Sequence, residues 1–400
     1  MRNRLLLVAS IALSAGLISM IFIGAGQVAG QSVSAKNRLI VHEWGTMTSV
    51  IMDGAPATWR PLSEPSDLPD FVYGMGSPRQ RLGIVTDSRS VKASQSGTVR
   101  METPVVYFYS ERPITATAKV DFPQGNITEW YPQGQRQDSG LSWNAIQVLP
   151  GFTSELPVDS KQTNSRYYAA RATDSAPVRV LGNEGLQDEK FLFYRGVGTF
   201  DMPLSVNLEG DTVSVASAGP KAPQVILFEN HNGEVRYQIA NLADNQAVFS
   251  RESAVKTMTA LRGDLISMLQ AAGLYPQEAR AMLNTWGDQW FEEGLRIFYI
   301  MPRKTVDSVI PMTIDPAPTE MKRVIVCRTE VITPEKEAAI REAVANLGDE
   351  SVEVRDLAAK VLNRQGRFLK LILENLQEKT GDAAIKARID DLMAKIPSRP

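Results

Sequence analysis

The period of the hydrophobic residues is the feature that most limits what this chain can fold into. From about residue 38 to about residue 250, apolar and polar side chains alternate, as they do from Met101 to Tyr109. Glycine, proline and asparagine separate the alternating segments, one of which we expect at residues 167–171. A period of two in short segments is typical of antiparallel sheets. We therefore expect a β-rich domain over residues 36–250, built as one or two sandwiches.

The period becomes helical after residue 250. Apolar residues recur every three or four positions over residues 258–272, and a second helix is expected to end at Gly287. Alternating segments then return at residues 295–301 and 321–332. The sequence therefore predicts a mixed α/β segment over 251–332 and, for the whole chain, an α+β fold.

The last part of the chain, residues 333–400, is predicted to be α-helical. Four helices are expected, at residues 334–347, 351–364, 367–379 and 383–396, with glycines between them. The spacing of Asp349, Val354-Arg355, Ala358 and Leu362 resembles a HEAT-type helical repeat, and Asp382, Ile385-Lys386 and Ile389 repeat it imperfectly. Repeats of this kind usually need about three units to bury their faces. We therefore expect this segment to cap the preceding domain or to contact a protein partner.

Residues 1–35 have the pattern of an export leader. Arg2 and Arg4 precede an apolar run over residues 5–25, and Val33-Ser34-Ala35 fits a cleavage site. At roughly 20 residues, the apolar run is also long enough to span a bilayer as an uncleaved anchor, which is the one membrane contact that the sequence suggests. Both alternatives place Lys36 and the rest of the chain outside the cytoplasm. We expect an extracytoplasmic protein, either periplasmic or secreted.

Composition excludes several classes of function. The formal net charge is −2 and no basic patch is present, which argues against a nucleic-acid partner. Cys327 is the only cysteine, so no disulfide can form within the chain, and its apolar strand context predicts a buried, inert thiol. The two histidines, His42 and His231, are too few for a multi-histidine zinc site. The sequence names no cofactor and contains no nucleophile elbow, HExxH motif or P-loop.

The segment around His42, Glu43 and Trp44 is the first candidate site. In an extended strand, His42 and Glu43 point to opposite faces and cannot serve one site unless a bulge intervenes. A catalytic role for the two residues therefore competes with a simpler alternative, in which His42 is a hydrogen-bonded core residue beside Trp44. His231 precedes Asn-Gly between two alternating segments, which predicts a plain residue at a hairpin turn.

Charged residues also interrupt other apolar strands. Glu102, Glu129 and Arg195 stand in such surroundings, where burial without a partner would cost several kcal/mol. One interpretation is a structural ion pair of Arg195 with Glu102 or Glu129. The alternative is a cleft in which paired carboxylates perform acid–base chemistry. The ligand in that cleft would contact Trp44, Trp130, Arg195, Trp290 and Glu293.

Several strings resemble an uncharacterised group of secreted bacterial proteins. They are His42-Glu43-Trp44-Gly45-Thr46, Met101-Glu102-Thr103-Pro104-Val105, Ile127-Thr128-Glu129-Trp130-Tyr131-Pro132, residues 191–196 and residues 290–294. The resemblance spans most of the chain after the leader. It implies export and a shared fold, and it supplies no mechanism.

Three functions remain open from the sequence. The first is an extracytoplasmic binding or scaffold protein without enzymatic activity, which rests on the β-rich body, the helical tail and the missing catalytic motifs. The second is a secreted hydrolase, with glycans as one substrate class, whose acids come from Glu43, Glu102, Glu129 or Glu293. It requires at least two of these acids to face one open cleft. The third is a mononuclear metal site built on His42 and carboxylates.

Overall fold

The large sheet is organised around β1 (Leu39–Met52), a strand whose fourteen residues are all buried. The structure, a computed structural model, describes residues 38–58, 68–75, 96–153, 155–217, 219 and 224–395. The predicted leader at residues 1–35 lies outside these residues. Within them, strands and helices occur together, and the fold is α+β as the sequence predicts.

The central sheet has ten strands in the described part of the chain. Their order is β15 (Glu234–Ala240), β14 (Val225–His231), β17 (Gly294–Ile300), β19 (Glu320–Val331), β1, β4 (Val99–Ser110), β11 (Leu192–Gly198), β6 (Gly125–Tyr131) and β3 (Tyr73–Gly74), with β2 (Ala55–Pro56) paired to β1. Residues 36–250 and 251–332, which differ in period, thus contribute strands to the same sheet. The difference in period reflects the insertion of helices between strands.

One strand pair departs from the expected antiparallel pattern. β1 and β19 run parallel, with register from Ile40 opposite Glu320 to Ile51 opposite Val331. A parallel pair needs a long crossover connection and cannot be made by a hairpin. Because some 270 residues separate the two strands, the local hairpin signals in the sequence could not reveal this pairing.

Two smaller sheets complete the β-structure. One contains β10 (Gly185–Glu189), β9 (Val178–Gly182), β8 (Gly140–Val148), β5 (Ile114–Val120) and β18 (Met312–Asp315), with β7 (Gln135–Gln137) paired to β8. The other contains β12 (Leu204–Glu209), β13 (Thr212–Ser217) and β16 (Gln246–Ser250). The strand predicted at residues 167–171 is wrong, because Arg166–Arg171 form the 3-10 helix η2. Its buried residues, Tyr167 and Ala170, are three positions apart, which matches the period of a 3-10 helix.

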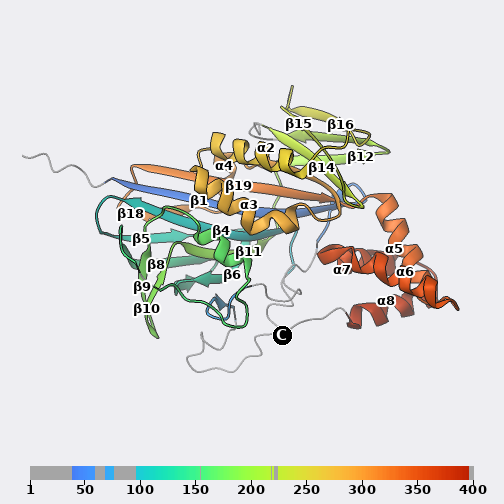
Figure 1. Cartoon of the computed structure of the whole chain (residues 1–400), viewed down its shortest axis with the longest axis horizontal. Helices are drawn as coiled ribbons and strands as arrows, with labels where there is room; N and C mark the ends of the chain where they lie inside the picture. Colours follow the sequence, from blue (N-terminus) through green and yellow to red (C-terminus); the bar gives the residue numbers. More distant parts are fainter. Residues whose placement is uncertain are drawn as a thin grey trace, which may run out of the picture. The chain divides into compact units, whose positions relative to one another are not determined.

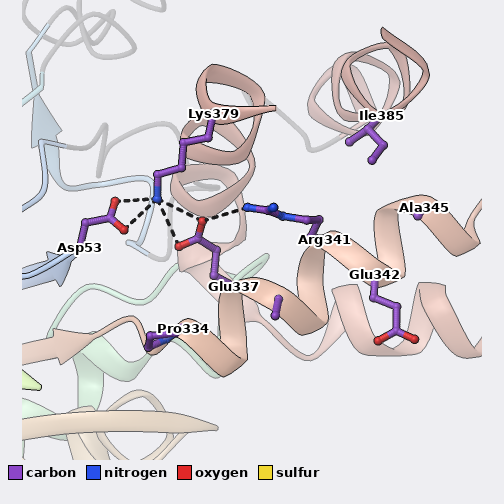
Figure 2. A pocket seen from close by; sticks show the side chains of 9 residues that line it. Asp53, Pro334, Glu337, Arg341, Glu342, Ala345, Lys379 and Ile385 are labelled. Atoms are coloured by element: carbon purple, nitrogen blue, oxygen red, sulfur yellow. Dashed lines mark hydrogen bonds and ion pairs between the residues drawn. The ribbon is translucent and has the colours of Figure 1, made fainter. Parts of the chain in front are cut away.

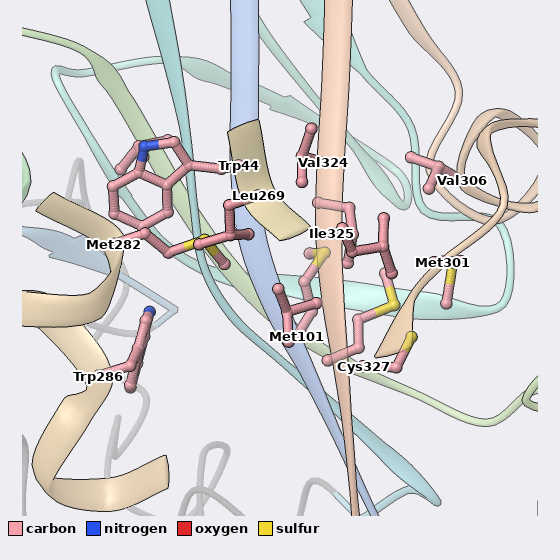
Figure 3. Packing of buried hydrophobic residues seen from close by; sticks show 14 of the residues in the cluster. Trp44, Met101, Leu269, Met282, Trp286, Met301, Val306, Val324, Ile325 and Cys327 are labelled. Carbon is pink, nitrogen blue, oxygen red and sulfur yellow. The ribbon is translucent and has the colours of Figure 1, made fainter. Parts of the chain in front are cut away.

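Two helices cover one face of the central sheet. α2 (Met258–Ala271) and α3 (Pro276–Trp290) lie over β1 and β19 (Figure 1). Met282 and Trp286 of α3 pack toward Trp44 of β1 in a cluster that also contains Leu269 (Figure 3). The expectation that α3 ends at Gly287 is wrong. The helix continues to Trp290. Gly287 leaves room for the side chain of Arg262, because a Cβ on Gly287 would lie 2.6 Å from Arg262 Nη1.

The helical tail contains the four predicted helices. They are α5 (Pro334–Asn346), α6 (Val352–Asn363), α7 (Leu369–Lys379), preceded by the 3-10 turn η3 (Gly366–Phe368), and α8 (Ala383–Lys395) (Figure 1). Their apolar residues form a second core with Val50 and Met52 of β1 and with Ile332. The apolar side chains of α6 are only partly covered: Ala358 and Leu362 are buried, and Leu357 is 64% exposed.

A short helix, α4 (Arg303–Val309), follows β17 and was not predicted. Among the described residues, no helix is long and apolar enough to cross a membrane.

Candidate functional site

His42 is a fully buried core residue under α3. Its Nδ1 lies 2.9 Å from Oε2 of Glu278, which belongs to the first turn of α3. Tyr109 donates a hydrogen bond to the same carboxylate at 2.7 Å, and the ring of Tyr275 lies 4.5 Å from the imidazole. Burial and the Glu278 carboxylate raise the pKa of Tyr109. This arrangement fits the core alternative for His42.

Glu43 points to the opposite face of β1, as the strand period requires. It accepts hydrogen bonds from Arg323 Nε and from the Tyr194 hydroxyl, and Arg323 also donates to Asp307 at 2.9 Å. The side chains of Glu43 and Arg323 are both inaccessible to solvent. Although burial opposes it, the charge of Glu43 raises the pKa of Arg323. Glu43 is therefore part of a closed ion pair.

The bulge that could have brought His42 and Glu43 together occurs too late in the strand. The pairing of β1 with β4 shifts register between Trp44 and Thr46. The bulge is formed by Thr103 and Pro104 of β4, which lie opposite Gly45, and a Cβ on Gly45 would lie 2.9 Å from Cα of Pro104. Trp44, just before the bulge, is completely buried near Tyr107.

Glu102 belongs to a different ionic cluster. Arg367 of η3 donates to it at 2.6 Å, Arg100 Nε lies 3.4 Å from its Oε1, and both Glu102 and Arg367 are buried. Burial favours the neutral acid, but the charges of Arg367 and Arg100 outweigh it and lower the pKa of Glu102. Arg195 also contributes to this lowering. Glu102 is thus a buried, ion-paired acid, but its charged hydrogen-bond donor is Arg367, where the sequence predicted Arg195; the Thr48 hydroxyl also donates to it, at 3.3 Å.

Of the remaining sequence candidates, Glu129 and Arg195 adjoin the Glu102 cluster, because β11 lies between β4 and β6. Glu129 of β6 stands directly opposite Arg195 of β11, and both are buried. Trp130 and Trp290 are buried, so neither presents a face to a ligand. Glu293, with a side chain 27% exposed, accepts hydrogen bonds from the backbone of Asn232 at 3.0 and 3.1 Å.

The proposed acids therefore do not face one open cleft in the part of the chain that the structure describes. Glu43 and Glu102 are held by different arginines, on different elements. Within the same residues, no group of three or more His, Cys, Asp or Glu side chains could hold a metal ion. The condition that the hydrolase hypothesis sets, two of these acids facing one open cleft, is not met by these residues.

An open groove on the helical tail is the better candidate site. It has a volume of about 580 Å³ and is lined by Asp53, Pro334, Glu337, Ala338, Arg341, Glu342, Ala345, Lys379 and Ile385 (Figure 2). Most of these residues come from α5, at positions that recur every three or four residues and so share one helix face. α7 contributes Lys379, α8 contributes Ile385, and the turn after β1 contributes Asp53.

Ion pairs fix most of the charges in the groove. Lys379 Nζ lies 2.7 Å from Asp53 and 3.1 Å from Glu337, and Arg341 lies 3.7 Å from the same glutamate (Figure 2). The hydrogen bond from Lys379 is the main reason that the pKa of Asp53 is lowered. Asp53 has φ of +54° and precedes Gly54 at +74°, so a tight turn presents the carboxylate to α7.

Glu342 differs from the other charged residues of the groove. It is exposed, and the described residues provide it with no ion pair. The groove is also lined by the small or apolar side chains of Ala338, Ala345 and Ile385. The groove thus offers an apolar surface next to one carboxylate that is able to bind a cation.

Sequence reasoning indicated the helical tail as a contact surface but did not identify these residues. For α5, the sequence does indicate a shared face, because Ala338, Arg341, Glu342 and Ala345 recur at helical spacing. The approach of Asp53 and Lys379 could not be inferred, because 326 residues separate them.

Comparisons with known proteins add little. No family model matches the chain, and no curated protein matches it. The chain is similar to a solved structure described as the Fcho1 Mu homology domain of Danio rerio with bound Eps15 peptide, with 7% identity, over 74% of this chain and 97% of that chain. The TM-score is 0.28, which is too low for the likeness to carry an argument.

Proposed function

We propose that this chain is an extracytoplasmic binding or scaffold protein whose helical tail holds a segment of a protein partner. The observation that carries the proposal is the open groove over α5, α7 and α8, with apolar side chains next to the unpaired carboxylate of Glu342. The extracytoplasmic location is supported by the leader pattern of residues 1–35.

The chemistry of the groove specifies the partner segment. Small apolar residues of the partner would contact Ala338, Ala345 and Ile385. A lysine or arginine of the partner would pair with Glu342, because opposite charges across an interface favour association and fix its register. Arg341 and Lys379 already have acidic partners, so an acidic segment would meet less complementary charge.

Hydrolysis is the weaker proposal. A general acid must reach the substrate, and a catalytic pair must share one site. Glu43 and Glu102 are enclosed by arginines and lie in separate clusters. These contacts favour a structural role for both acids.

Site-specific photocrosslinking tests the binding proposal. A photoreactive phenylalanine analogue is placed at Ala338 in the groove and, as a control, at the exposed Thr115 of β5. In extracytoplasmic fractions of the producing cells, position 338 should give a discrete crosslinked product that Glu342→Lys removes. The proposal fails if position 338 yields no more product than position 115, or if Glu342→Lys leaves the product unchanged.

A further inference from the structure

The strand β10 has one open edge. It pairs with β9 on one side, and no described strand pairs with its other side (Figure 1). Its five residues include neither lysine nor proline, and its pairing with β9 has no bulge. These are devices by which proteins commonly protect an open edge. The edge of β15 in the central sheet is covered instead, because Lys256 donates its backbone N–H to the carbonyl of Val235 at 2.8 Å.

The backbone groups of Leu186 and Asp188 point to the open edge of β10. Leu149, which follows β8, donates its N–H to the carbonyl of Pro177 at 2.9 Å. Because these groups alternate in direction along an antiparallel strand, the odd-numbered residues of β9 face β8 and the even-numbered ones face β10. The even-numbered residues of β9 pair with the odd-numbered residues of β10. The N–H and C=O groups of Leu186 and Asp188 are therefore directed away from β9, and no described residue bonds to them.

An exposed apolar pair lies beside this edge. Leu181 of β9 and Leu186 of β10 stand directly opposite each other and are 76% and 62% exposed. In the neighbouring pair on the same face, Arg179 donates two hydrogen bonds to Asp188, at 2.6 and 2.8 Å, and lies 4.6 Å from the ring of Phe152. The two charges next to the leucines thus neutralise each other. An apolar patch with its charges paired in this way is typical of a contact surface.

We propose that two copies of this chain associate through β10. About a two-fold axis, the two β10 strands would run antiparallel with Leu186 of one copy opposite Leu186 of the other. Each Leu186 would then donate its N–H to the carbonyl of the other. Leu181 and Leu186 of both copies would form one continuous row of apolar side chains across the dimer.

A second copy fits this edge because it supplies both features in matching positions. It brings the same outward backbone groups and the same pair of leucines, and a two-fold interface requires such self-complementarity. The ion pair of Arg179 with Asp188 leaves neither copy with an unpaired charge at these two positions. Since the contact involves one short strand from each copy, we expect a weak, concentration-dependent dimer. No residue of β9 or β10 lines the groove, so the inference does not depend on the partner proposed there.

Sedimentation equilibrium of the purified protein tests the association. The average mass should rise from that of a monomer toward that of a dimer as the concentration approaches about 100 µM, in the range of weak interfaces. Leu186→Lys places like charges on both sides of the axis, and it should weaken the dimer by about tenfold or more. Val248→Lys is the matched control, because Val248 is 67% exposed on β16, another strand at the end of a sheet. It should not change the association.

A cysteine crosslink tests the position of the axis. The Cα atoms of the two Leu186 residues would lie about 5.5 Å apart, within the range that a disulfide spans. Cys327 is buried, so the introduced thiol is the accessible one. With a mild oxidant, Leu186→Cys should give a disulfide-linked dimer in much higher yield than Val248→Cys.

Three results would each overturn the inference. In the first, the unaltered protein remains a monomer up to about 100 µM. In the second, Leu186→Lys, folded as judged by circular dichroism, associates as tightly as the unaltered protein. In the third, Leu186→Cys gives no more crosslinked dimer than Val248→Cys. Because Leu186 is exposed, neither of its substitutions removes a core side chain.

Discussion

Arg367 donates a hydrogen bond to Glu102 at 2.6 Å, although 265 residues separate them in the chain. The pair joins η3 of the helical tail to β4 of the central sheet, and both side chains are almost fully buried. Arg328 of β19 and Glu292 extend the contact, since Arg328 donates to Glu292 at 2.6 Å and Arg367 Nε lies 3.7 Å from it. The tail is therefore attached through a buried ionic cluster as well as through apolar packing.

Breaking this pair should destabilise the protein strongly. Removing one partner leaves a buried charge uncompensated, and we expect Glu102→Gln or Arg367→Met to lower the free energy of unfolding by about 3–5 kcal/mol. The double variant should lose less than the two single losses added together. Urea unfolding followed by tryptophan fluorescence measures these values.

Asp53→Asn provides the matched control, because it removes the exposed ion pair with Lys379. Such surface pairs contribute about 0–1 kcal/mol. A loss for Glu102→Gln no greater than that for Asp53→Asn would contradict the structural role of the buried pair.

Stability should fall in acid because of Glu330. Burial favours its neutral form, but the charges of Arg296, Lys336 and Arg328 prevail and lower its pKa to about 2. The unfolded-state pKa is near 4.5, so the contribution is complete above that value and is lost as the pH falls from about 4.5 toward 2. It amounts to about 3 kcal/mol at neutral pH.

Urea unfolding at a series of pH values tests this dependence. In Glu330→Gln, whose side chain cannot ionise, stability at neutral pH should be lower and the decline below about pH 4.5 should be shallower. If the unfolding free energy of Glu330→Gln declined as steeply below about pH 4.5 as that of the unaltered chain, the decline would come from other carboxyl groups.

Cys327 should be unreactive in the native protein. Burial raises the pKa of its thiol to about 12, and only the thiolate reacts rapidly. We expect no reaction with a colourimetric disulfide reagent at neutral pH and complete reaction after addition of denaturant. Rapid labelling under native conditions would show that the interior between β17 and β19 opens.

His42 should matter for stability. In His42→Gln, the carboxylate of Glu278 keeps its hydrogen bonds from Tyr109 and the Tyr275 backbone but loses the imidazole. We expect a loss of about 1–3 kcal/mol in unfolding free energy, measured by urea titration. An unchanged unfolding curve would remove the evidence for a core role.

The sequence predicts local structure here better than long-range pairing. The four tail helices and strands such as β4 follow from residue period, because the period depends on neighbouring residues alone. The parallel pairing of β1 with β19 and the contact of Glu102 with Arg367 depend on residues that lie hundreds of positions apart. No local pattern encodes such contacts.

The candidate site shows the same division. That His42 and Glu43 face opposite sides follows from the strand period. That both are enclosed depends on α3 and β19, which supply Glu278 and Arg323. Charged residues within apolar strands therefore indicated buried ionic contacts. The groove, by contrast, is lined largely by residue types that are common on helix surfaces, so residue type alone does not identify it.

The most direct test of the account compares two variants in the crosslinking experiment at position 338. Glu342→Lys reverses the unpaired charge of the groove, whereas His42→Gln alters the buried cluster under α3. The account predicts that Glu342→Lys lowers the yield of the crosslinked product by about tenfold or more, equivalent to about 1.4 kcal/mol, and that His42→Gln changes it by less than about twofold. Loss of the product in His42→Gln, with full yield in Glu342→Lys, would contradict the assignment of function to the groove.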